Sequence, residues 1–161
     1  MNTADLGETL PMLFAELIDG ARTGEAYMIN RGDTGLLKSL DKLSATAASK
    51  LTANGSSIAA HVDHLRYGLS LMNRWAAGEN PFDDADWRAS WRRTRVSSVE
   101  WKQLRDQLEN EAHRWLEELR KPRQIPQLEM NAVVGSVAHL AYHVGAIRQI
   151  DLSAKGPSAN D

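Results

Sequence analysis

Four of the five histidines lie in two close pairs, and the imidazole nitrogen is a common ligand of divalent metal ions. His139 and His143 are four residues apart, so on a helix their side chains lie one turn apart on the same face, as two ligands of one ion require. His61 and His64 form the second pair. Neutral imidazole suits zinc, nickel, copper and iron, and three protein ligands plus a water give the open arrangement of catalytic centres.

Hydrophobic periodicity predicts three long helices, over residues 57–77, 98–120 and 129–150. The first begins after a cluster of turn and N-cap residues, the second has a serine cap and stops at Lys121-Pro122, and the third follows a segment rich in helix breakers. Their apolar stripes are Ile58, Val62, Leu65, Leu69, Met72 and Ala76; Trp101, Leu104, Leu108, Ala112, Trp115 and Leu119; and Val133, Val137, Leu140, Val144 and Ile147.

Each histidine pair lies beside the apolar stripe of its helix, on the flank of a face that turns toward the core. If the two helices are neighbours, the flanking faces converge between them, which is where helical bundles build metal sites. His61 could supply a fourth ligand there, or it could hydrogen-bond a ligand or a bound substrate.

A structural interpretation competes with the metal site, because a histidine on a helix flank is often a half-buried side chain with a hydrogen-bond partner. The second pair on another core helix favours metal binding over that interpretation. His113 lies off the apolar stripe among charged residues, so we expect it on the surface.

The remaining segments predict a single domain over residues 1–152. We expect a helix over 6–19, a second helical stretch over 36–48 capped by Asp33 or Thr34, and a short extended piece over 27–29. The long connection 79–96, with Trp87 and Trp91, predicts a cover pinned by two tryptophans, with a lid over the site as the alternative. Residues 153–161 are expected to be a disordered tail.

Composition excludes several classes of function. The chain has 161 residues, no cysteine, and 19 basic against 21 acidic side chains for a net charge of -2, so thiolate sites are excluded and nucleic acid is not an expected partner. It lacks the Glu-x-x-His pairs of di-iron bundles, the His-Glu-x-x-His motif of zincins and the glycine-rich motifs of nucleotide folds. With no signal peptide and no membrane-spanning apolar run, we expect a cytoplasmic protein with no membrane partner.

Two motifs resemble the DinB-like family of four-helix-bundle metalloenzymes, over residues 56–150. The stretch 57–65, Ser-Ile-Ala-Ala-His-Val-Asp-His-Leu, is similar to the family's Ser/Thr-Ile start with a ligand histidine seven residues on. The stretch 139–147, His-Leu-Ala-Tyr-His-Val-Gly-Ala-Ile, is similar to the family's His-x3-His-x-Gly-Gln-Ile, with Ala146 where the family often has glutamine.

The resemblance implies an all-α four-helix bundle in which His64, His139 and His143 are the metal ligands and His61 is an additional residue near them. It implies a divalent-metal-dependent enzyme, with zinc or nickel, acting on a small molecule as a hydrolase or, with a low-molecular-weight thiol, as an S-transferase or isomerase. A homodimer is also implied.

A non-catalytic metal-binding or stress-response helical module is the alternative to an enzyme. Tyr67, Tyr142 and Arg148 are candidate helpers in catalysis. A tyrosine on a bundle helix usually packs its ring, and an arginine near a helix C-terminus complements the helix dipole, so we assign them no role.

Overall fold

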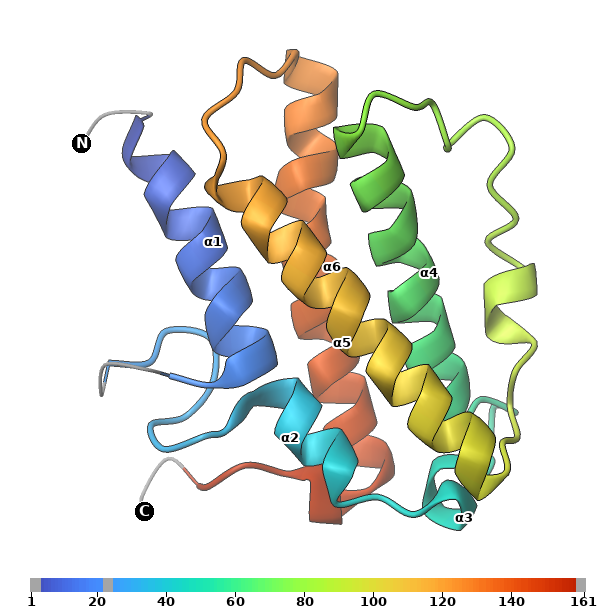
Figure 1. Cartoon of the computed structure of the whole chain (residues 1–161). Coiled ribbons are helices and arrows are strands. Elements are labelled where there is room, and N and C mark those ends of the chain that lie inside the picture. The colour runs from blue at the N-terminus through green and yellow to red at the C-terminus, as the bar shows by residue number, and fades with distance from the viewer. Residues whose placement is uncertain (1–3, 22–24, 159–161) are drawn as a thin grey trace.

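The computed structural model describes residues 4–21 and 25–158, and within them every regular element is a helix (Figure 1). This confirms the predicted all-α class. In chain order the elements are α1 (Ala4–Asp19), α2 (Gly35–Asp41), α3 (Ala45–Ala48), α4 (Ile58–Ala76), the 3-10 helix η1 (Ala89–Trp91), α5 (Ser98–Arg120), α6 (Gln127–Ile150) and the 3-10 helix η2 (Leu152–Ala154).

The long helices α1, α4, α5 and α6 pack around one core, with α4 against α5 and α6, and α1 against the same two helices (Figure 1). The predicted apolar stripes supply most of that core. The α6 stripe is at most 4% exposed throughout, and on α5 only Leu119 is half-buried. The three long helices predicted from periodicity are therefore confirmed, each within two residues at its ends.

Side-chain caps define where two of the long helices begin. Ser57 accepts a hydrogen bond from the Ala60 amide at the start of α4, and its hydroxyl donates to the Thr94 carbonyl at 2.8 Å. At the start of α5, Ser97 and Glu100 form a reciprocal capping box. The Ser57 cap therefore also fixes the connection between α4 and α5 against the helix that carries His61 and His64.

The helix predicted over residues 36–48 is two helices instead, α2 and α3. The chain turns at Leu43, whose side chain is buried, and the Ser44 hydroxyl accepts the Ala47 amide and starts a new helix. Of the two predicted caps, Thr34 is the N-cap of α2 but makes no side-chain capping bond, and the Asp33 carboxylate accepts the Gly35 amide at the start of the helix. Gly35 has a φ of 80° and packs so tightly on α1 that a Cβ would lie 2.5 Å from the Ile18 carbonyl oxygen.

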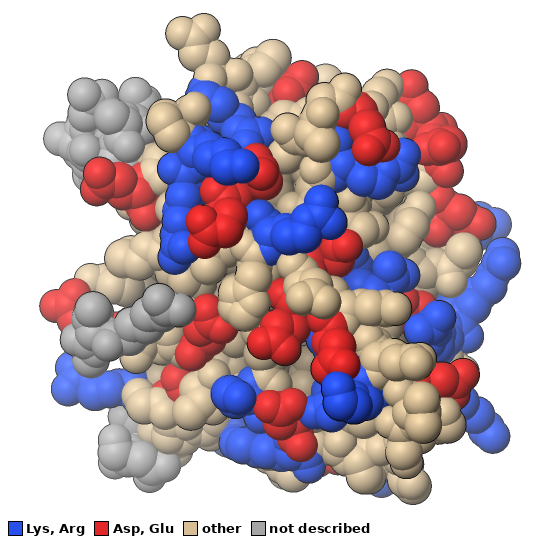
Figure 2. Space-filling view, in the orientation of Figure 1, with Lys and Arg blue, Asp and Glu red and all other residues tan. Residues whose placement is uncertain are grey.

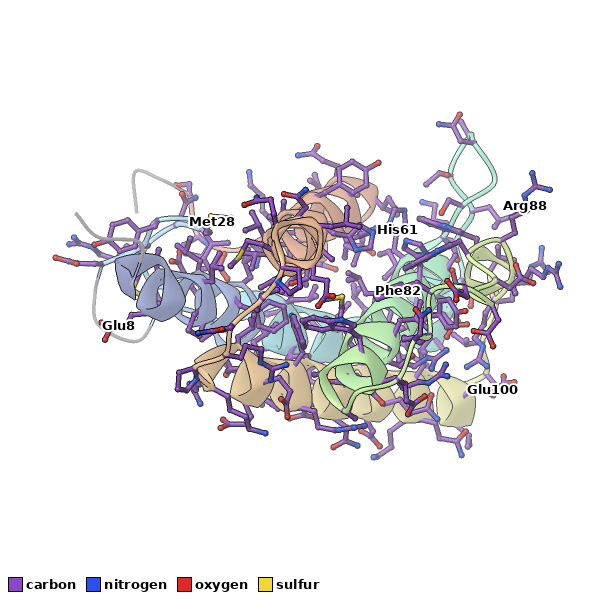
Figure 3. The ribbon with its side chains drawn as sticks, turned by 90° about the horizontal axis from the view of Figure 1, so that it is seen from above. Glu8, Met28, His61, Phe82, Arg88 and Glu100 are labelled. Carbon is purple, nitrogen blue, oxygen red and sulfur yellow. The ribbon has the colours of Figure 1, made fainter. Side chains whose placement is uncertain are left out.

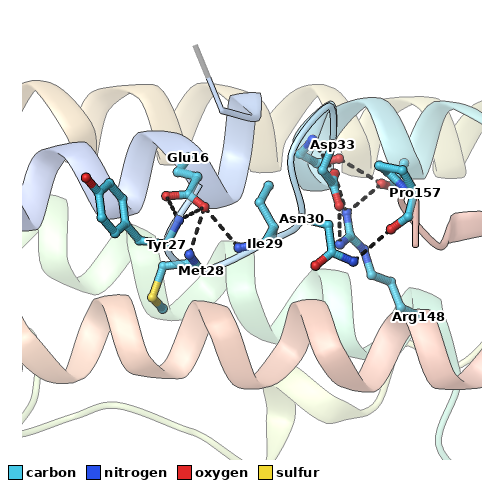
Figure 4. A network of polar contacts seen from close by, with 10 residues as sticks. Glu16, Tyr27, Met28, Ile29, Asn30, Asp33, Arg148 and Pro157 are labelled. Atoms are coloured by element: carbon cyan, nitrogen blue, oxygen red, sulfur yellow. Dashed lines mark hydrogen bonds and ion pairs between the residues drawn. The ribbon is translucent and has the colours of Figure 1, made fainter. Parts of the chain in front are cut away.

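The short extended piece predicted over residues 27–29 is not a strand. The buried Glu16 carboxylate of α1 accepts the backbone amides of Tyr27, Met28 and Ile29 at 2.8 to 2.9 Å (Figure 4). These amides bond to one carboxylate rather than to a neighbouring strand, so the segment bends around the end of the side chain.

The C-terminal residues contact the fold as far as Pro157, which differs from the predicted disorder beginning at 153. Ala154 is fully buried in η2, and the Asn30 side-chain amide donates to the Pro157 carbonyl at 2.8 Å. Nearby, Arg148 of α6 makes a two-pronged ion pair with the buried Asp33 at 2.7 and 2.8 Å (Figure 4). Residues 159–161 lie outside the described part of the chain.

The surface seen in Figure 2 carries interleaved acidic and basic side chains with no extended region of one sign. This agrees with the near balance of charges in the sequence. Among the described residues, no helix combines the length and the apolar character that crossing a bilayer requires.

Candidate metal centre

The facing sides of α4 and α6 bring three histidines together. The His139 Nε2 atom lies 3.1 Å from His64 Nε2 and 3.0 Å from His143 Nε2, and the three ligand atoms all lie within 4.8 Å of one another. Two nitrogens bound to one ion at about 2.0 to 2.1 Å are about 2.9 to 3.4 Å apart, depending on the angle at the metal. The spacing of the three atoms therefore fits a shared divalent ion.

The position of these histidines follows from the helices that carry them. His64 lies beside the buried residues Val62 and Leu65 of α4 and is 7% exposed, while His143 lies between α6 core residues and is 1% exposed. His139, one turn earlier on α6, is half-buried. The convergence predicted from the flanking faces of the two helices is confirmed.

His61 lies behind His143 rather than beside the other two ligands. Its Nδ1 atom is 2.8 Å from His143 Nδ1, and it is not one of the three residues whose atoms could share an ion. Figure 3 shows His61 in the region between α4 and α6. When His143 donates the hydrogen bond between the two Nδ1 atoms, its proton is on Nδ1. The lone pair on His143 Nε2 then faces His139.

Burial lowers the pKa of every histidine in this cluster, and repulsion between the rings adds to the shift of His64 and His143. The pKa of His64 falls to about 4, first through burial and then through the nearby charges of His139 and His61. The pKa of His143 falls to about 3 for the same first reason, with His139, His61 and His64 adding repulsion. Burial also lowers the pKa of His61 and His139. The four rings are therefore neutral at pH 7, the form in which imidazole binds a metal.

The connection between α4 and α5 covers one side of the cluster. The Trp91 ring stacks on His64 with centroids 4.3 Å apart and an interplanar angle of 25°, and Trp87 lies 5.8 Å from the same ring. Ser90, between them, places its hydroxyl 2.7 Å from His64 Nδ1. The predicted cover therefore lies on the site, although Trp87 remains 42% exposed.

Sequence reasoning missed Ser90, because a single serine 26 residues from His64 carries no periodic or motif signal. The spacing of Trp87 and Trp91 predicted that this segment covers the site. It did not predict the hydrogen bond between Ser90 and His64.

The candidate helpers Tyr67, Tyr142 and Arg148 have other contacts in the fold. The Tyr67 hydroxyl accepts the Asp86 amide at 2.9 Å, and Arg148 is held by Asp33. Tyr142 is 67% exposed, with its ring edge against His143 at 5.1 Å between centroids. The side chain of His113 is 42% exposed and contacts Asp19, away from the cluster.

Comparisons of the chain with models of known protein families, with curated proteins and with solved structures find no match. Three neutral imidazoles on two packed helices form a donor set suited to zinc, nickel, copper or iron, with no protein carboxylate or thiolate needed.

Proposed function

We propose that the protein is a divalent-metal-dependent enzyme of the DinB-like family, built as a four-helix bundle, with His64, His139 and His143 as ligands. Zinc or nickel is the proposed ion and a small molecule the proposed substrate. One observation carries the proposal: the Nε2 atoms of the three histidines converge from α4 and α6. The ring of contacts among α1, α4, α5 and α6 supports the bundle.

An ion at such a site supplies a Lewis acid that lowers the pKa of a water or a low-molecular-weight thiol and stabilises developing negative charge. The chain's own residues prepare for that chemistry. Three protein ligands leave a further coordination position for substrate. Trp91 excludes water from the His64 ring face, and the half-buried His139 gives access from solvent. Hydrolysis, thiol S-transfer and isomerisation are all compatible with this arrangement, and we propose one of these three.

The metal content of freshly purified protein tests the site. We expect about one ion per chain by elemental analysis, lost in His64→Ala and His139→Ala because each removes a ligand. His113→Ala is the matched control and should keep the metal, since His113 contacts Asp19 instead. Wild-type protein that takes up no divalent ion under any loading condition would contradict the proposal.

A non-catalytic metal-binding module is the alternative, favoured by the way the histidines connect α4 to α6 inside the packed fold. A measurement of substrate turnover separates the enzyme from the non-catalytic module. Turnover of thiol-acceptor or ester substrates that disappears in His139→Ala supports the enzyme. Retained metal with no turnover across broad panels of such substrates supports the module.

We also propose a homodimer formed through the outer face of α6. Between Glu129 and Arg148 this helix has no acidic side chain, lysine or arginine, and apart from Asn131 its exposed residues are apolar or small. Helices that lack a charged face are usually covered. Asn131 aside, the exposed residues of this stretch are Met130, Ala132, Val134, Gly135, Ala138, Tyr142 and Gly145.

A further inference from the structure

Ser90 makes two hydrogen bonds that together determine the orientation of the His64 ring. Its Oγ atom lies 2.7 Å from the Trp87 carbonyl oxygen and 2.7 Å from His64 Nδ1. A carbonyl oxygen only accepts, so the single hydroxyl proton of Ser90 goes to Trp87. Toward His64 the hydroxyl oxygen must then accept, and Nδ1 must carry the proton.

A neutral imidazole has one N–H and one lone pair. With the proton on Nδ1, the lone pair of His64 is on Nε2, the atom that lies 3.1 Å from His139 Nε2. We propose that Ser90 is a positioning residue of the metal centre, which holds His64 in the tautomer and orientation that present Nε2 to the ion.

The position of Ser90 is set by contacts that do not involve a metal. Ser90 is 5% exposed within η1, whose Ala89 amide donates to the Asp86 side chain. The Asp86 amide in turn donates to the Tyr67 hydroxyl of α4. The hydroxyl is therefore fixed relative to α4, so no ordering of this segment is needed when an ion binds.

This assignment gives the long connection between α4 and α5 a function in the site. Acceptors for the remote N–H of a ligand histidine typically change metal affinity by about 10- to 100-fold when removed. His61 occupies the corresponding position at His143, but it lies on α4 itself, whereas Ser90 belongs to the covering segment. Ser90 thus connects that segment to the ligand set.

The inference rests on the proposed metal site, and the tautomer of His64 tests it separately from metal binding. Histidine ring ¹H–¹⁵N correlation spectra of the metal-free wild-type protein should show His64 protonated on Nδ1. In Ser90→Ala the ring should populate both tautomers. A wild-type His64 protonated on Nε2, or an unchanged tautomer in Ser90→Ala, overturns the assignment whether or not the protein binds metal.

Metal affinity provides the second readout, measured by Zn²⁺ competition with a chelator. Ser90→Ala should bind about 10- to 100-fold more weakly with unchanged stoichiometry, and Ser90→Thr, which keeps the hydroxyl, should bind close to wild type. Ser70→Ala is the matched control, since the Ser70 hydroxyl donates to the Tyr67 carbonyl on the same helix. Equal affinity of Ser90→Ala and wild type overturns the proposal. If Ser90→Ala does not fold, the tautomer of His64 in the wild-type protein still tests the proposal.

Discussion

The imidazoles of His64 and His143 are buried, and this burial determines how the site responds to protons. Their pKa values of about 4 and about 3 lie well below the ordinary value of 6.5. A lowered histidine pKa means that the neutral form persists to lower pH, so protons do not compete with an ion until the pH approaches these values.

We therefore predict that protonation of His64 and His143 weakens Zn²⁺ binding only as the pH falls toward about 4 and about 3. Three histidines with ordinary pKa values would lose affinity from about pH 6.5 downward. Isothermal titration of Zn²⁺ into metal-free protein at several pH values, corrected for proton release to the buffer, distinguishes lowered from ordinary histidine pKa values. Release of one or more protons on binding at pH 6 would contradict the low pKa values.

His61 is predicted to act on the metal through His143. Its Nδ1 atom is 2.8 Å from His143 Nδ1, so His61→Ala removes the acceptor but no ligand atom. We expect His61→Ala to keep one ion per chain with affinity weakened by about 10- to 100-fold. Complete loss of the metal, as expected for His64→Ala, would show instead that His61 is itself a ligand.

At the scale of elements, the segment that leads into α2 is joined to α6 by a buried charge pair between Asp33 and Arg148. Asp33 is 4% exposed, accepts two hydrogen bonds from Arg148, and also accepts the Gly35 amide. Removal of one partner of a buried pair leaves the other charge without compensation, which costs far more than loss of a surface pair.

Asp33→Ala is accordingly predicted to lower the free energy of unfolding by about 3 to 5 kcal/mol. Asp41→Ala is the matched control on α2, because Asp41 is 54% exposed and its pairs with Lys38 and Arg105 should contribute at most about 1 kcal/mol. Urea unfolding of the two variants provides the measurement. Equal losses would contradict an energetic role for the buried pair.

The long helices could be predicted from sequence because burial of one face produces a period that extends over many residues. The break between α2 and α3 could not, since no proline or glycine marks it and Ser44 begins a new helix only once Leu43 is buried. The same periodicity placed the two histidine pairs beside the core-facing stripes, but the choice of His64 over His61 as a ligand came from the resemblance to the DinB-like family. Ser90 was missed because its contact depends on how the connection folds back over α4.

At the scale of the whole molecule, an ion at the site would stabilise the fold because its ligands belong to two different helices. An ion that binds only the folded state at about 100 times its dissociation constant adds about 2.7 kcal/mol, or about 5 to 10 °C in melting temperature for a domain of this size. We expect this shift when zinc is added to metal-free protein. His139→Ala should show none, and an equal shift in that variant would place the stabilising ion elsewhere.

The charge-free outer face of α6 makes the oligomeric state testable with a matched pair of valines. Val134 on α6 is 47% exposed and Val99 on α5 is 67% exposed. A helix of 24 residues is about 36 Å long, enough to contribute to the roughly 800 Å² per partner that stable interfaces bury. A symmetric dimer through this face would place each Val134 in the interface, where a carboxylate would be buried without a partner.

By light scattering after size exclusion, we expect wild type and Val99→Glu to be dimers and Val134→Glu to be a monomer with its metal content unchanged. A monomeric wild type, or a dimeric Val134→Glu, would show that this face is not the interface.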